Sequence, residues 1–118
     1  MQQLIDTLFY VINRPNSNIL VVIGKPFNML DCWEAVVFSN LPMSRTHRTS
    51  KVVEICNGSK ITLLADDSSL PQKSAGLIFP LCILVGEVEP QSVQFLKPRN
   101  RPDPWNPCPL LIQIGVQQ

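Results

Sequence analysis

The chain has 118 residues, of which 45% are hydrophobic, so its length and composition fit one globular domain with a sizeable core. Its formal net charge of +1 excludes an overall positive potential that would attract nucleic acid, so any contact with nucleic acid would need a local basic patch. The longest apolar stretch, residues 77–85, is interrupted by Pro80 and is far shorter than the ~20 residues of a membrane-spanning helix. We therefore expect no membrane partner.

The first half of the chain predicts two helices around one strand. Residues 3–13 place apolar side chains at helical spacing. Residues 19–23 are apolar and mostly β-branched, which is typical of a strand buried on both faces at the centre of a parallel sheet. Asn28 can cap the next helix, and a proline follows each predicted helix. Residues 44–49 are predicted to be a polar, basic loop.

The clearest local signal is Asn57-Gly58, which lies between the β-like runs 51–56 and 59–64. An Asn-Gly pair in this position predicts a β-hairpin with a two-residue type I′ turn. That turn would place Glu54 opposite Ile61. Each face of this hairpin carries both polar and apolar residues, so we expect it to be half buried.

The second half predicts a polar loop at 66–74, a buried strand at 81–85 and a last strand at 110–114. Between the last two strands lies a Pro-rich arm, residues 90–109, which holds six of the eleven prolines. Such a segment is ordered only when it packs on its own domain or is held by a partner.

These elements predict a small single-domain α/β fold with a mixed sheet, two helices, a β-hairpin (51–56/59–64) and a Pro-rich C-terminal arm. The parts of this one domain are an α/β core (1–89), the arm (90–109) and a last strand that returns to the core (110–118).

The four cysteines, Cys32, Cys56, Cys82 and Cys108, include no CxxC pair, and His47 is the one histidine. Structural zinc sites normally show short paired spacings, so we predict no metal and no cofactor. The N-terminal residues lack the basic start of a signal peptide, which favours a cytoplasmic location and reduced thiols.

This order of elements resembles the P-loop ATPase core of viral and phage terminase large subunits. Residues 19–23 resemble the strand after the first helix, and residues 57–59 resemble the Asn-Gly-Ser turn of a hairpin. Gly76 resembles a loop glycine, residues 81–87 the Walker B strand and residues 110–114 the coupling strand. The resemblance spans residues 3–114 as a pattern of elements.

The sequence departs from that family at the residues that carry its chemistry. No GxxxxGK[ST] loop is present, and the pair Gly24-Lys25 follows the wrong strand. Gly86 stands where the Mg²⁺-binding Walker B aspartate is expected, and Glu87 stands where the water-activating carboxylate is expected. The resemblance therefore implies a degenerate core with a vestigial Walker B residue, Glu87.

Two clusters are candidate binding sites. Arg45, His47, Arg48 and Lys51 lie among serine and threonine residues, a combination that suits phosphate contacts in nucleic acid, although a solvated loop has the same pattern.

The second cluster lies on the arm and comprises Phe95, Lys97, Arg99, Arg101 and Trp105. A nucleic-acid backbone with Trp105 stacked on a base is one interpretation. Docking to a protein surface fits the many prolines better, because their fixed φ angles lower the cost of ordering the arm.

No nucleophile, base and orienting group can be named together, so we predict no enzyme. Our first hypothesis is a non-catalytic protein-interaction or assembly module, in the setting of a virus or phage, that joins a larger complex through the arm. The alternative is a degenerate terminase-like regulatory module linked to nucleic acid or nucleotide. The host cytoplasm or the virion is the expected location in the viral setting. The sequence is compatible with a homo-oligomer as well as with a monomer.

Overall fold

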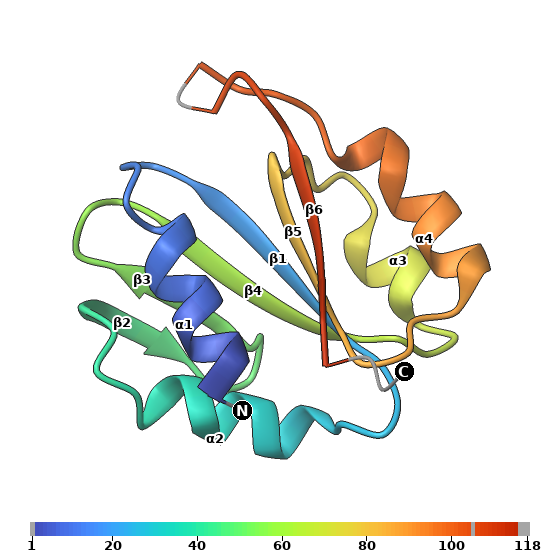
Figure 1. The fold of residues 1–118 in the computed structure, drawn as a ribbon, viewed down its shortest axis with the longest axis horizontal. Coiled ribbons are helices and arrows are strands. Elements are labelled where there is room, and N and C mark those ends of the chain that lie inside the picture. Colours follow the sequence, from blue (N-terminus) through green and yellow to red (C-terminus); the bar gives the residue numbers. More distant parts are fainter. Residues whose placement is uncertain (1, 105, 116–118) are drawn as a thin grey trace.

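Residues 18–23 form the centre of a six-stranded mixed sheet in the computed structural model, which describes residues 2–104 and 106–115 (Figure 1). In chain order the elements are α1 (Gln2–Val11), β1 (Asn18–Ile23), α2 (Met29–Val37), β2 (Met43–His47), β3 (Val52–Ile55), β4 (Lys60–Ala65), α3 (Leu70–Ser74), β5 (Leu81–Val85), α4 (Pro90–Leu96), the 3-10 turn η1 (Lys97–Arg99) and β6 (Leu110–Ile114).

The strand order is β2-β3-β4-β1-β5-β6. Strand β1 is parallel to both β4 and β5, and β6 is parallel to β5, whereas β3 is antiparallel to β2 and β4. This topology confirms the predicted single-domain α/β class with a mixed sheet and a hairpin.

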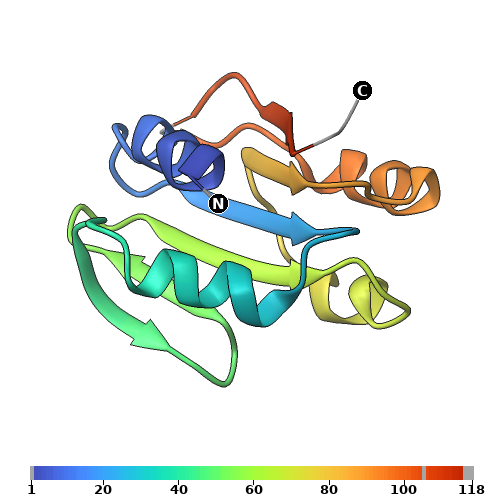
Figure 2. The ribbon, with the colours of Figure 1, turned by 60° about the horizontal axis from the view of Figure 1, so that its bottom comes forward.

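Helices cover both faces of the parallel part of the sheet. Figure 2 shows α1 and α2 on one face, and their side chains share a core cluster with Val21 of β1. Leu70 of α3 and Leu96 of α4 share a second cluster with Leu20 and Val22. Alternate residues of β1 therefore enter opposite cores, which explains why a strand of this kind is apolar throughout.

Three segments differ from the sequence-based expectation. Residues 43–47 form strand β2 where a loop was expected, because an edge strand with exposed side chains carries no apolar pattern. Helices α3 and α4 lie in segments predicted to be a loop and part of the arm. Both begin with a proline at the first or second helical position, where proline favours a helix start.

The hairpin is present, but its register is one residue away from the prediction. Glu54 pairs with Lys60, because the loop holds three residues. Ile55 N–H donates to Ser59 O (2.8 Å), and Gly58 N–H donates to Ile55 O (3.0 Å). Gly58 has a φ of 90°, as expected for a type I turn closed by a residue with positive φ.

The cysteines divide into two buried and two exposed thiols. Burial raises the pKa of Cys32 to about 11 and that of Cys82 to about 12, whereas Cys56 and Cys108 are exposed. Because the thiolate is the reactive form, iodoacetamide at mildly alkaline pH should alkylate Cys56 and Cys108 in the native protein and all four cysteines after unfolding. Mass spectrometry of intact and digested protein measures this, and rapid native labelling of Cys82 would contradict the burial.

Candidate functional site: an uncovered basic sheet face

The antiparallel part of the sheet has one face that no helix covers among the described residues. Val53 and Ile55 of β3 point into the core beneath α1 and α2. The alternate residues Val52 and Glu54 point to the other face, where α3 and α4 pack on β4, β1 and β5. Strands β2 and β3 contribute no side chain to that second core, so their outer face stays open.

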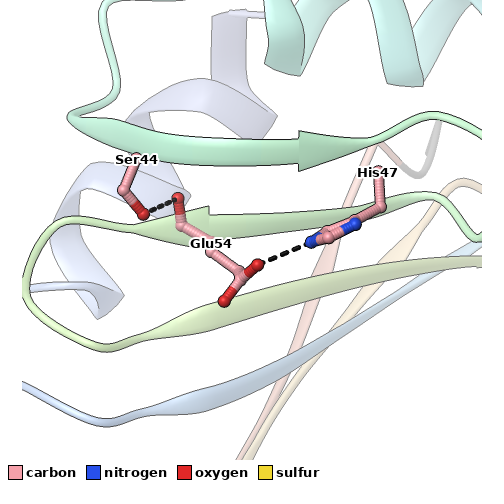
Figure 3. A network of polar contacts seen from close by, with 3 residues as sticks. All are labelled: Ser44, His47 and Glu54. Carbon is pink, nitrogen blue, oxygen red and sulfur yellow. Dashed lines mark hydrogen bonds and ion pairs between the residues drawn. The ribbon is translucent and has the colours of Figure 1, made fainter.

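A charged row crosses this face through the strand register. Arg45, Glu54 and Lys60 lie directly opposite one another on β2, β3 and β4. His47 Nε2 lies 2.5 Å from the Glu54 carboxylate, and Ser44 Oγ donates to the Glu54 carbonyl at 3.2 Å; both contacts are drawn in Figure 3. The hydrogen bond from His47 is the main cause that lowers the pKa of Glu54, and the charges of His47, Arg45 and Lys60 add to it. The one carboxylate of this row is therefore already partnered.

Beside this row lies an open groove of about 680 Å³, which we call the basic groove. Its lining combines aliphatic side chains, hydroxyls and three lysines from different segments: Lys51 before β3, Val52 of β3, Lys60, Thr62 and Leu64 of β4, Lys73 of α3 and Leu77 after it. The size is within the range of ligand and peptide sites.

Asp67 is the acidic residue that lines the basic groove. Its carboxylate accepts hydrogen bonds from the Ser69 N–H (2.8 Å) and the Ser69 hydroxyl (2.5 Å), which lower its pKa, as does the nearby Lys73 ammonium. Three lysines, Lys51, Lys60 and Lys73, line the groove against this one carboxylate, so the rim carries a net positive charge.

The predicted basic cluster is only partly brought together. Arg45 and His47 share the open face, where Glu54 lies between Arg45 and Lys60. Lys51 also lines the basic groove, and its ammonium lies 5.3 Å from the Trp33 ring centroid of α2 and donates to Arg48 O. The other two groove lysines, Lys60 and Lys73, were not singled out from the sequence, because they lie in segments that only the fold brings together.

The arm packs on its own domain. Asn100 donates from its side chain to the carbonyls of Phe79 and Pro80, both at 3.2 Å. The Arg99 guanidinium lies 3.8 Å from the Phe95 ring centroid and donates to the Phe95 carbonyl. The two arm candidates Phe95 and Arg99 thus contact each other within the chain.

The other three arm candidates are placed differently. Lys97 and Arg101 are exposed, and Arg101 donates to the Pro98 carbonyl at 2.7 Å. Trp105 lies outside the described residues. Partner binding through the arm stays a prediction.

Glu87 lies at the carboxyl end of β5, beside the loop that follows β1. In open α/β sheets, ligands bind where neighbouring parallel strands lead to helices on opposite faces, and β1 and β5 meet this description. Here the loop after β1 fills that position. Glu87 N–H donates to Lys25 O at 2.6 Å, and a Cβ added to Gly86 would lie 2.8 Å from the Phe27 ring. The crevice is closed by the chain itself.

Within residues 2–104 and 106–115, no group of three His, Cys, Asp or Glu side chains is placed to hold a metal ion. In the same ranges no helix has the length and apolar character needed to cross a membrane. No family model matches the chain, and no curated protein or solved structure matches it significantly.

Proposed function

We propose that the chain is a non-catalytic protein-interaction module that binds an acidic, partly apolar segment of a partner protein in the basic groove. One observation carries the proposal: aliphatic side chains and a rim of three lysines lie together beside the sheet face of β2 and β3 that the described helices leave uncovered. Assembly into a virus or phage complex stays the setting predicted from the sequence.

The chemistry of the groove defines the segment that it fits. Leu77, which is 37% exposed, and the half-buried Val52 offer aliphatic surface, so apolar side chains of the ligand gain by leaving water. Lys60 and Lys73 attract carboxylates at the edge, which adds specificity and speeds association. An extended acidic peptide with apolar residues matches both features.

Nucleic acid is the second candidate, favoured by Arg45 and Lys60, which lie on either side of Glu54 on the open face. It ranks lower because no aromatic side chain lines the groove in the described part of the chain, and single-stranded nucleic acid is usually held by stacking as well as by charge.

The test measures binding of a short fluorescent peptide that alternates glutamate and leucine. We expect the double variant Lys60→Glu/Lys73→Glu to bind at least about tenfold more weakly, because two attractive rim charges become repulsive. The matched control is Lys97→Glu/Arg101→Glu, which makes the same change of charge on exposed residues of the arm. Fluorescence anisotropy at two salt concentrations gives the affinities, and circular dichroism confirms folding.

Three outcomes would contradict the proposal. The first is the absence of peptide binding at low salt. The second is an equal loss of affinity in the groove and control variants, which would assign the affinity to net charge or to the arm and not to the groove. The third is tighter binding of labelled oligothymidylate than of the peptide, with a steep salt dependence, which would favour the nucleic-acid function instead.

A further inference from the structure

The two edges of the sheet are unequally protected against pairing with another chain. Strand β2, at one edge, carries Arg45 and His47 and has an irregular register between Met43 and Arg45. Charges and bulges of this kind prevent edge-to-edge pairing. Strand β6, at the other edge beyond β5, has the sequence LLIQI, with no charge and no internal proline (Figure 1).

The outer edge of β6 offers backbone groups in a defined pattern. Leu110 N–H donates to Pro80 O (2.8 Å), and Ile114 O accepts from Gly86 N–H (2.9 Å), so these residues bond toward β5. In a parallel pair, residues that bond toward one side alternate with residues that bond toward the other. Leu111 and Gln113 therefore direct their N–H and C=O groups away from the sheet.

Apolar surface accompanies this edge. Leu110 is 43% exposed, Leu111 is 39% exposed, and Tyr10 at the end of α1 is 70% exposed. Tyr10 and Leu110 line the same pocket of about 170 Å³. An added strand would thus meet apolar side chains as well as backbone donors and acceptors.

We infer that a second copy of this chain pairs antiparallel with β6 through a two-fold axis at Ile112. In that register, Leu111 of each copy lies opposite Gln113 of the other copy. The two equivalent pairs, one on each side of the axis, exchange backbone hydrogen bonds. No charge in residues 110–114 meets its own copy, so no like-charge repulsion opposes pairing. This inference does not rest on the basic groove.

The first experiment measures the mass of the protein in solution by light scattering on a sizing column over a range of concentrations. We expect a dimer for the wild type and for Leu111→Ala, which keeps the outward N–H. Leu111→Pro removes that N–H without removing a donor to β5, and we expect it to be monomeric. A monomeric wild type, or a Leu111→Pro variant as dimeric as Leu111→Ala, would overturn the inference.

A second measurement tests the register and does not depend on the proline variant. In a Cys56→Ser/Cys108→Ser background, Ile112→Cys places one thiol opposite its own copy in a non-hydrogen-bonded pair, at a Cα separation of about 4.5 Å that a disulfide can span. We expect rapid formation of a disulfide-linked dimer on mild oxidation. Leu110→Cys, which would lie opposite Ile114, is the control and should link much more slowly. Equal linking of both variants would contradict the two-fold axis at Ile112.

Discussion

Replacing Gly86 with alanine is expected to lower the free energy of unfolding by about 3 kcal/mol, from a strained backbone angle and from overpacking. Gly86 has a φ of 77°, and its added Cβ would lie 2.4 Å from the Lys25 carbonyl oxygen and 2.8 Å from the Phe27 ring. A carbonyl held in the sheet connection cannot withdraw as a flexible side chain can. Urea unfolding followed by circular dichroism measures the change.

Gly76 provides a matched control for this experiment. It has a similar φ of 79°, but no atom lies within 4 Å of an added Cβ. Gly76→Ala therefore isolates the cost of the backbone angle, which we expect to be about 1 kcal/mol. Equal destabilisation by the two substitutions would mean that the crevice at Gly86 yields easily and is not closed by close packing.

This geometry bears on the resemblance to packaging ATPases. The resemblance predicted from the sequence would give Gly86 the position of that family's metal-binding aspartate, yet any side chain at this position meets the loop that carries Lys25 and Phe27. Gly86→Asp should destabilise the fold at least as much as Gly86→Ala and should create no affinity for Mg²⁺-ATP. We therefore propose that this end of the sheet has a structural role in this chain.

The central part of the fold could be predicted because burial leaves a direct pattern in the sequence. Residues 19–23 are apolar without interruption because β1 contacts a core on each face. Asn28 was recognised as a helix cap, and its side-chain oxygen accepts from Asp31 N–H at 2.8 Å. Both signals are local, so they can be read without knowledge of the rest of the chain.

The missed elements lack such a local pattern. Strand β2 has exposed side chains that could equally belong to a loop. The hairpin register depended on whether the turn holds two or three residues, and an Asn-Gly pair fits both cases when Gly58 takes a positive φ. Helix α4 was obscured by Pro90, although Val93 and Leu96 follow at helical spacing and both contact the second core.

The candidate site was the hardest part to predict, because its residues come from separate segments. Lys51 stood out within the predicted basic cluster and does line the groove, but Lys60 is on another strand and Lys73 is on a helix that follows it. Only the sheet order and the position of α3 against β4 bring these side chains to one face. No spacing pattern in the sequence indicates that residues of these separate segments lie close together.

Replacing Asn106 with leucine is expected to lower the free energy of unfolding by about 2 kcal/mol and to release the preceding arm. Asn106 is 1% exposed, and its side-chain amide donates to the Ser17 hydroxyl at 3.1 Å. The Ser17 hydroxyl in turn donates to Arg14 O, so the arm is tied to the segment before β1. Leucine keeps the side-chain volume but removes the amide donor. The buried Ser17 hydroxyl oxygen then loses a hydrogen bond that had replaced its hydrogen bonds to water.

Urea unfolding and hydrogen exchange together distinguish the two effects of this substitution. We expect faster exchange in residues 97–104 of the variant, while β1 and β5 stay protected until global unfolding. Asn40→Leu changes an exposed asparagine in the same way and should alter neither quantity by more than about 0.5 kcal/mol. Unchanged exchange in the arm would mean that other contacts, such as those of Asn100, suffice to hold it. Faster hydrogen exchange in residues 97–104 would instead identify Asn106 as the residue that holds the arm to its own domain.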